Sequence, residues 1–344
     1  MRVRIIGGGL AGALLAWRLS DLVPDWRVEV VLTGRTGRVD ATAASGGAVR
    51  AYEDDPGQRR LALDSLVELL GSPTLRRWAD FRPSAATYLR RDRAGLDDAV
   101  AEIEHRLPGS ARIADAAELA GLGWAGLAPG DVAVVERQAG QIAPGRLREA
   151  ALADSRARCL ESTLDVVATG NADLTVVAAG AWTPGLLRAS GLPADSYRTK
   201  SLQYSVHPVE GTRPGQFVDG VTGVYGRPDG AYGLLLGVPT DAWDIDPDAP
   251  PTTPALADRA RRLAGERFPG LRIGPARLRI GSVDCYHDEP GLALRPVGPP
   301  GHGVFTFTGG AGGSAKTALA ASLRAATRLV ESGRTAQPTP VERR

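Results

Sequence analysis

A short apolar run, a glycine-rich bend and a helical pattern open the chain. Residues 2–6 end in Ile5-Ile6 and predict a buried strand, and residues 7–12 are rich in glycine. The helical pattern then runs to Pro24, and a second apolar run occupies residues 28–32. Strand, turn, helix and strand in this order predict a βαβ unit of the length that a dinucleotide site requires.

The remaining pattern predicts further helices and strands. From residue 54 to about 122, leucine and alanine recur between charged positions, which predicts helices with solvated faces. Residues 171–182 predict a buried strand that ends in small side chains, where a ligand can come close. Residues 223–226 and 233–236 favour a hairpin across residues 227–230. We expect a surface loop at residues 246–254, a helix at 254–268 and strands at 276–284 and 303–308. A glycine loop at 309–313, a helix at 314–332 and a frayed tail at 333–344 are expected to follow.

Composition then narrows the class of protein. The chain has 344 residues, of which 43% are hydrophobic and 23% charged, with a net charge of +2. No basic tract with interleaved aromatic residues occurs, so the sequence predicts neither a nucleic acid nor a membrane surface as a partner. Two cysteines and four scattered histidines predict no disulfide framework and no metal site, and they favour a cytoplasmic location. We therefore expect an enzyme that acts on a small molecule, and the sequence contains no indication of its oligomeric state.

The glycine-rich bend is the first candidate site. Gly7, Gly9 and Gly12 fit the pattern in which glycines let the backbone approach a diphosphate that binds at a helix amino end. Leu10 and Ala11 complete the bend. Such sites usually carry an acidic residue after the second strand for the ribose. Here we expect the ribose or phosphate contacts to come from a different set of residues, namely Thr33, Gly34, Arg35 and Arg38.

Four further segments carry a family resemblance. They are residues 40–50 (DATAASGGAVR), 140–144 (GQIAP), 177–182 (VAAGAW) and the glycine loop at 309–313. Together with the βαβ unit they resemble the FAD-dependent D-amino-acid oxidase family, which includes glycine oxidase and sarcosine oxidase. The resemblance covers roughly residues 1–332. It implies FAD rather than NAD, with the flavin ring between two domains.

The resemblance also implies a fold and its division. We expect an α/β protein with a Rossmann-type FAD-binding domain and a second, mainly antiparallel β substrate domain that carries helices. The FAD-binding domain is expected to be discontinuous. The expected boundaries are 1–53, 140–190 and 275–332 for the FAD-binding domain, 54–139 and 191–274 for the substrate domain, and 333–344 for a flexible tail.

Small residues at several positions would let the backbone reach a flat ring. By resemblance to the family, they and their neighbours are candidates for contacts with FAD. These candidates are Ser45, Gly46, Gly47, Val166, Ala179, Gly180, Trp182, Gly309, Gly310, Ala311, Gly312 and Gly313.

Four residues are candidates for catalysis. By resemblance to the sarcosine oxidase branch, Arg50 would lie near the flavin and favour its anionic reduced form, and Lys316 would contact the flavin. Tyr232 and His287 are candidates to orient or deprotonate the substrate ammonium. Cys285 lies near the position at which sarcosine oxidases link a cysteine to the flavin. We expect non-covalent FAD, and the covalent link through this thiol stays open.

Two positions differ from the family. Leu235 stands where the sarcosine oxidase branch has a lysine that assists the reaction with oxygen, and Val283 stands where the glycine oxidase branch has an arginine for the substrate carboxylate. We therefore expect a larger or unusual amine, such as a peptidyl or cyclic amine or an intermediate of a biosynthetic tailoring pathway. Its oxidation to an imine would proceed by hydride transfer to flavin N5.

Three alternatives remain at this point. A flavin monooxygenase reduced by a nicotinamide would share the bend at Gly7, although Ala179-Gly180 and Gly309-Gly310 depart from its usual motifs. A non-catalytic flavin-binding subunit would explain the departures from the oxidase pattern. Residues 310–317 also imitate a phosphate-binding P-loop, but Ala315 stands where that motif has glycine.

Overall fold

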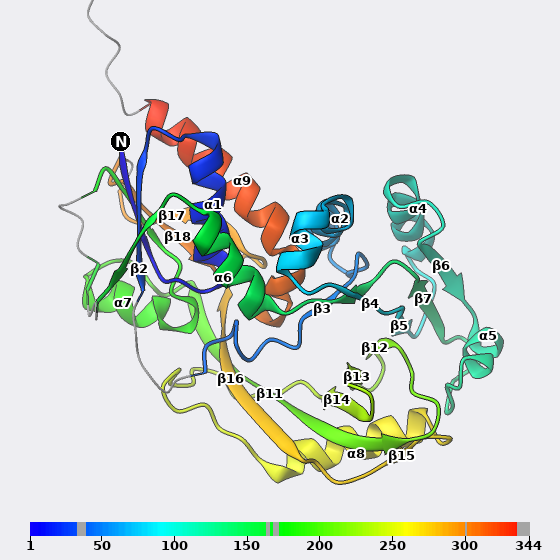
Figure 1. The fold of residues 1–344 in the computed structure, drawn as a ribbon. Coiled ribbons are helices and arrows are strands. Elements are labelled where there is room, and N and C mark those ends of the chain that lie inside the picture. Colours follow the sequence, from blue (N-terminus) through cyan, green and yellow to red (C-terminus); the bar gives the residue numbers. More distant parts are fainter. Residues whose placement is uncertain (33–38, 163–165, 168–171, 300, 336–344) are drawn as a thin grey trace, which may run out of the picture.

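The computed structural model describes residues 1–32, 39–162, 166–167, 172–299 and 301–335. Within these ranges the strands form a six-stranded, a nine-stranded and a three-stranded sheet. We call the first two the parallel and the antiparallel sheet. Figure 1 shows that helices gather on the parallel sheet, and that the antiparallel sheet forms a separate layer below it. The predicted α/β fold, with a Rossmann-like region and a second, mainly antiparallel domain, is confirmed.

The parallel sheet contains the predicted βαβ unit. Its strand order is β17 (Ala293–Pro296), β18 (Val304–Thr308), β10 (Leu174–Val177), β1 (Arg2–Ile6), β2 (Arg27–Leu32) and β9 (Arg158–Glu161). All neighbours are parallel except β17 and β18. Ile5 of β1 is fully buried between Val30 and Val176. Such a sheet is apolar on both faces because helices cover both, which explains the continuous apolar runs in the sequence.

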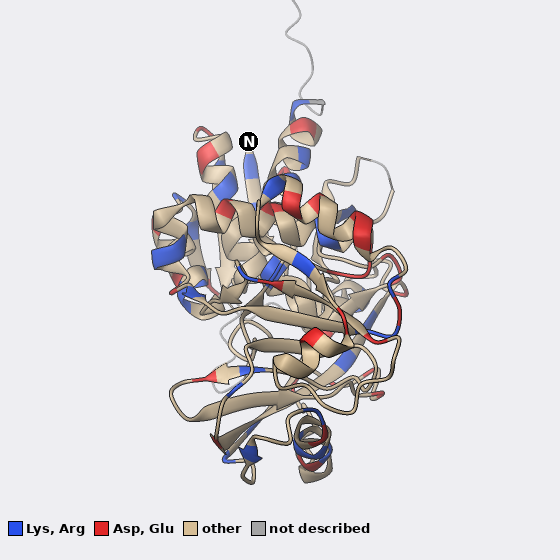
Figure 2. Cartoon of the chain, turned by 90° about the vertical axis from the view of Figure 1, so that its right-hand side faces the viewer, with Lys and Arg blue, Asp and Glu red and all other residues tan. Residues whose placement is uncertain are grey.

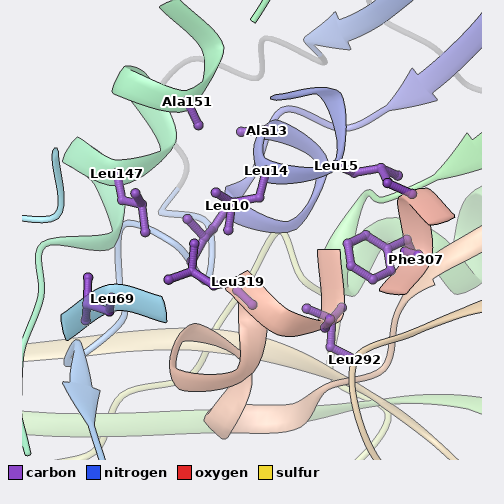
Figure 3. Packing of buried hydrophobic residues seen from close by; sticks show 14 of the residues in the cluster. Leu10, Ala13, Leu14, Leu15, Leu69, Leu147, Ala151, Leu292, Phe307 and Leu319 are labelled. Carbon is purple, nitrogen blue, oxygen red and sulfur yellow. The ribbon is translucent and has the colours of Figure 1, made fainter. Parts of the chain in front are cut away.

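Successive side chains of β1 pack on opposite faces of the sheet. Val3 and Ile5 belong to a core formed with α1 (Leu10–Leu22), α2 (Pro56–Gly71), α6 (Pro144–Asp154) and α9 (Ser314–Thr335). Ile6 instead packs with Leu187 of α7 (Thr183–Ala189). Figure 3 shows how the helices of the first core converge, with their leucines directed toward α1. The helix α3 (Pro73–Trp78) lies beside α2 and α6.

The antiparallel sheet extends away from the helical layer. Its order is β15 (Arg272–Ile273), β11 (Tyr197–Glu210), β14 (Gly233–Gly237), β13 (Tyr225–Asp229), β12 (Gln216–Asp219), β5 (Ala86–Arg90), β7 (Val132–Glu136) and β6 (Ala111–Ala114), with β16 (Leu278–His287) also paired to β11. Leu234 and Leu236 pack with α8 (Pro254–Arg267), so Leu235 between them faces the other way. This alternation separates a core face of the sheet from a face that can hold a ligand.

Short elements connect the two layers. The small sheet consists of β3 (Ala48–Val49), β8 (Gly140–Gln141) and β4 (Arg82–Pro83). The helices α4 (Leu96–Arg106) and α5 (Ala116–Gly121) flank β6. Figure 2 shows basic and acidic positions interspersed over both layers, in keeping with the near-neutral balance of charge. None of the helices in the described ranges has the length and apolar character needed to cross a membrane.

Three predictions of secondary structure were wrong in part. The segment 54–122 is not wholly helical, because β5 and β6 lie within it and pair with β7. The hairpin turn lies at residues 230–232, because β13 continues to Asp229, which pairs with Gly233 at the start of β14. The helix α9 continues to Thr335, so the frayed tail does not begin at Gly333, and residues 336–344 lie outside the described ranges.

The expected domain boundaries stay a prediction. Helix α2 lies within the segment 54–139 that we assigned to the substrate domain, but it packs against α9 of the helical layer. The strands β5, β6 and β7 of the same segment join the antiparallel sheet. One stretch of chain therefore contributes to both layers.

Candidate active site

A large cavity is lined by residues of both layers. It has a volume of about 1240 Å³ and extends from the bend after β1, past the ends of β10 and β18, to the strands β11, β13, β14 and β16. Ligands of α/β proteins bind beyond the carboxyl ends of the parallel strands, where this cavity begins. Its volume exceeds the roughly 300–1000 Å³ of usual small-molecule pockets. There is room for an extended cofactor together with a smaller substrate.

The glycines of the bend have different roles. Gly7 has a φ of +113°, and a Cβ atom there would collide with the carbonyl oxygen of Ala178. A Cβ atom on Gly12, which does not line the cavity, would collide with the carbonyl oxygen of Gly7. At Gly9 the nearest atom to such a Cβ is Oγ1 of Thr42, at 3.3 Å. Packing therefore requires glycine at positions 7 and 12, whereas Gly9 keeps the cavity wall open.

The amino end of α1 faces the cavity at this bend. Leu10 donates its backbone N–H to Oγ1 of Thr42, at 3.0 Å, and Ala11 also lines the cavity. The amide groups at a helix amino end carry partial positive charge and bind phosphates. Opposite them, Arg148 of α6 pairs with Asp40 at 3.3 Å. Thr42 was not among the predicted residues, although its hydroxyl group stood out in the run of small residues 40–50.

Ser45, Gly46 and Gly47 form the next part of the wall. Gly47 has a φ of +66°, and a Cβ atom there would collide with the carbonyl oxygen of Ile142. A Cβ atom on Gly46 would lie 3.6 Å from Cδ1 of Leu235. The two layers come close together here because the first one presents only small side chains.

A buried charged cluster lies behind this wall. Glu53 accepts hydrogen bonds from Arg50 at 2.8 Å and from Lys316 at 2.9 Å. Burial alone would raise the pKa of Glu53, but the two cations more than offset it and lower that pKa. Burial also lowers the pKa of Lys316, against the attraction of Glu53. Arg50 and Lys316, predicted from distant parts of the sequence, therefore share one carboxylate beside the cavity.

Glu136 completes this cluster from the antiparallel sheet. Its carboxylate accepts the backbone N–H groups of Ala51 and Tyr52, at 2.7 and 2.9 Å. Burial raises the pKa of Glu136, and these two amides partly oppose the rise. The residues that follow Arg50 are thereby fixed to β7.

The predicted strand at residues 171–182 ends at the cavity. The strand β10 stops at Val177, and a 3₁₀ turn, η1 (Gly180–Trp182), follows it. Gly180 has a φ of +54° and borders open space. Trp182 donates its Nε1–H to Asp248 at 2.7 Å, which connects the cavity to the surface loop at residues 246–254, which we call the proline-rich loop. Ala179, Gly180 and Trp182 all line the cavity, as the prediction of FAD contacts requires.

The loop after β18 contributes the opposite edge. It contains the 3₁₀ turn η2 (Ala311–Gly313) and leads into α9. Gly310 to Gly313 line the cavity. Gly309 does not line the cavity. A Cβ atom on Gly309 would lie 2.8 Å from Cβ of His287, so the close packing of His287 favours glycine at this position. Its place in the structure is explained by packing rather than by a ligand.

The antiparallel sheet supplies an aromatic wall. Tyr204, Tyr225, Leu235 and Tyr286 line the cavity there. Burial, followed by the nearby Asp284, raises the pKa of Tyr286 to about 12, and the same two causes raise the pKa of Tyr225. Both phenols therefore stay protonated near neutral pH.

Two charged residues of this wall escaped prediction. Arg227 donates Nη1–H groups to Gln141 and Asp229, at 3.2 and 3.1 Å, so its guanidinium is bound to the protein. Asp284 lies in β16, and burial raises its pKa to about 6. In the sequence it is a single acidic residue in a strand of mixed polarity, and such a residue is usually solvated, so no local signal indicates its burial.

Several predicted residues do not reach the cavity. Tyr232 lies in the hairpin turn and is 79% exposed, and Val166 is 48% exposed. His287 accepts the N–H of Glu289 at Nδ1, at 2.9 Å, and its ring packs against Tyr197. None of the three lines the cavity, because turn residues and strand ends lie at its outside. The candidates Thr33, Gly34, Arg35 and Arg38 lie outside the described residues.

Cys285 does line the cavity. Its side chain is buried, and burial raises the pKa of the thiol to about 11. A neutral thiol is a weak nucleophile. The site therefore offers no activated thiolate in this state.

Comparisons with known proteins agree with this geometry. The family model for FAD dependent oxidoreductase matches residues 2–328. No curated protein matches the chain.

Solved structures share the fold at low sequence identity. Glycine oxidase from Geobacillus kaustophilus has 18% identity and a TM-score of 0.73 over 98% of this chain and 96% of that chain. L-proline dehydrogenase from P. horikoshii has 16% identity and a TM-score of 0.73 over 99% and 95%. NikD, described as an unusual amino acid oxidase essential for nikkomycin biosynthesis, has 16% identity and a TM-score of 0.72 over 99% and 95%.

Proposed function

Because the chain belongs to the DAO family of FAD-dependent oxidoreductases, we propose that it oxidises an amine or an amino-acid-derived substrate to an imine. The observation that carries the proposal is the continuous cavity, which joins a glycine cradle to an aromatic wall. The first part fits a dinucleotide, and the second part fits a small apolar molecule with a polar group.

The residues present fit FAD. The bend at Gly7 to Ala11, together with Thr42, would hold the diphosphate, and the small side chains at Ser45 to Gly47 leave space for a flat ring. When bound, FAD accepts at N5 the hydride of the carbon–hydrogen bond next to nitrogen. Arg50 and Lys316 carry positive charge beside this space, and Glu53 neutralises part of it. The remaining positive charge would stabilise negative charge on a reduced flavin.

We propose non-covalent FAD. The raised pKa of Cys285 favours the thiol, which does not form a bond to flavin as readily as a thiolate. The substrate would occupy the aromatic wall, with Tyr225 and Tyr286 around the reacting carbon and Leu235 excluding water.

The expected substrate is not a simple amino acid held by its carboxylate. Arg227 is bound to Gln141 and Asp229, and Arg198 is paired with Asp244 at 2.6 Å. Neither is placed as a free clamp for a carboxylate. A tailoring step in biosynthesis fits this arrangement, and NikD is described as belonging to such a pathway. Two free cysteines, Cys159 and Cys285, favour a reducing compartment, and we propose the cytoplasm.

A visible spectrum of the purified protein tests the proposal. We expect flavin absorbance that bleaches when a suitable amine is added without oxygen, and peroxide or a reduced acceptor when turnover is allowed. Bleaching by a nicotinamide alone would instead indicate a monooxygenase. A yellow protein that no amine reduces would indicate a flavin-binding subunit, and a protein that takes up no FAD would contradict the assignment of the cavity.

A further inference from the structure

One buried carboxylate oxygen in the aromatic wall has no hydrogen-bond partner among the described residues. Asp284 is only 7% exposed, and its Oδ2 atom makes no hydrogen bond with any residue in the described ranges. Burying a charged oxygen without a partner is unfavourable, because the oxygen loses its hydration and gains no ion pair or hydrogen bond in return. The arrangement becomes favourable when a ligand supplies the missing charge.

The carboxylate is directed toward the cavity. A Cβ atom built on Gly312, in the loop that borders the cavity, would lie 3.2 Å from Oδ2 of Asp284. Gly312 and Asp284 both line the cavity. Tyr225 and Tyr286 are near enough for the charge of Asp284 to raise their pKa values, after the larger effect of burial. Oδ2 is therefore buried at the edge of the cavity, between the aromatic wall and the loop that contains Gly312.

Cationic side chains of the same wall are engaged elsewhere. Lys200 is the register partner of Asp284 on β11, but its Nζ atom lies 4.7 Å from the ring centre of Trp243. No ion pair joins Lys200 and Asp284. Arg198 pairs with Asp244, as described above. Neither Lys200 nor Arg198 therefore compensates the charge of Asp284, although both line the same cavity.

We propose that Asp284 binds the protonated amine of the substrate. This inference rests on the proposed function and adds a substrate class: amines that present an ammonium group, rather than a carboxylate, to the aromatic wall. Oδ2 accepts an N–H of the ammonium, and Tyr225 and Tyr286 contact its alkyl groups and attract its charge. An ammonium has no lone pair, so this proton passes to the carboxylate of Asp284 before the neutral amine is oxidised. A substrate carboxylate at the same place would be repelled by Asp284.

Two probes of the same shape and opposite charge test this assignment. tert-Butylammonium has no hydrogen on the carbon next to nitrogen, so it cannot be oxidised to an imine, and pivalate is its carboxylate counterpart. Each is titrated into the holoenzyme while changes in the flavin absorption spectrum are recorded. We expect tert-butylammonium to bind at least about tenfold more tightly than pivalate, the scale of a buried charge pair.

Three variants sharpen the test. Asp284→Asn removes the charge at nearly constant shape, and Asp284→Ser is a second neutral variant in case the first does not fold. We expect both to weaken tert-butylammonium binding at least about tenfold and to leave pivalate binding unchanged or stronger. Asp288→Asn is the control, because Asp288 is an exposed carboxylate next to the end of β16 that does not line the cavity. It should leave both affinities unchanged.

Other outcomes separate this inference from the proposed function. Equal or tighter binding of pivalate, no spectral response to tert-butylammonium, or unchanged binding in the neutral Asp284 variants would overturn the role of Asp284. If the same protein is yellow and is bleached by amines, the proposed function stands nonetheless. Loss of the proposed function itself would be seen earlier, as a protein that retains no FAD or that no amine reduces.

Discussion

Removing the charge of Asp284 should stabilise the FAD-free protein above neutral pH. Burial raises the pKa of this carboxyl from 3.8 to about 6. At about 1.4 kcal/mol for each pKa unit, the difference corresponds to about 3 kcal/mol. The pKa of Asp284 is higher in the folded than in the unfolded protein, so protonation of Asp284 contributes to the free energy of unfolding. This stabilising contribution is fully present below pH 3.8 and is lost as the pH rises through about 6. Wild-type protein at high pH therefore carries the whole cost of the buried charge.

The variant Asp284→Asn has no charge to bury. From the two pKa values of Asp284, the wild-type protein should lose about 2 kcal/mol of unfolding free energy, relative to the variant, between about pH 4.5 and about pH 8. An unfolding entropy of about 2.1 cal/mol/K per residue makes this about 3 °C for 344 residues. FAD is left out so that only charges of the chain surround Asp284. The new amide changes stability at both pH values alike, so the pH-dependent part isolates the charge.

Thermal unfolding of both proteins at the two pH values measures this. We expect the melting temperature of the variant, relative to wild type, to rise by about 3 °C from the lower to the higher pH. Titration of Glu136 and other groups occurs in both proteins and cancels from the comparison. A relative melting temperature that is the same at both pH values, or that falls as the pH rises, would refute the reasoning that Asp284 is an uncompensated buried charge.

Three other substitutions test the cofactor side of the cavity. Gly9→Val should abolish FAD retention, because the valine side chain would enter the space for the diphosphate. The control Gly265→Val, at an open position of α8, should keep the protein yellow. Full yellow colour in Gly9→Val would contradict diphosphate binding at the glycine-rich bend. Leu235→Lys places an amine on the cavity face of β14 and should speed reoxidation of reduced flavin by oxygen, measured by stopped-flow absorbance; an unchanged rate would contradict its position beside the flavin. Cys285→Ser should leave all FAD in the supernatant after acid precipitation, as we expect for wild type, and flavin that precipitates only with wild-type protein would establish the covalent link.

The sequence predicted those elements whose pattern is local. The bend between β1 and α1 was recognised because glycine spacing, strand and helix lie within one short stretch. By contrast, β5 and β6 lie in a segment rich in leucine, alanine and arginine, and their pairing with β7 depends on residues distant in the chain. Strand formation there is decided by the sheet rather than by local preference.

The same difference applies to the site. Gly9, Arg50 and Lys316 were predicted as site residues because family motifs surround them, and the structure brings Arg50 and Lys316 to one carboxylate. The partner itself, Glu53, has no local signal. Asp284 was missed because a lone carboxylate in a strand is usually solvated. Only the packing of β16 against the neighbouring strand and loop removes it from water.

The proline-rich loop has a consequence for how such a protein can diverge. Residues 244–248 line the cavity, and their contacts with the rest of the chain include Trp182 to Asp248, Arg198 to Asp244 and Thr199 to Ile245. None of these contacts includes the glycine bend or the cluster around Glu53. Insertions or exchanges in the loop would redirect which molecules enter while the redox machinery stays intact. Retargeting by loop replacement is thus open to evolution and to protein engineers alike.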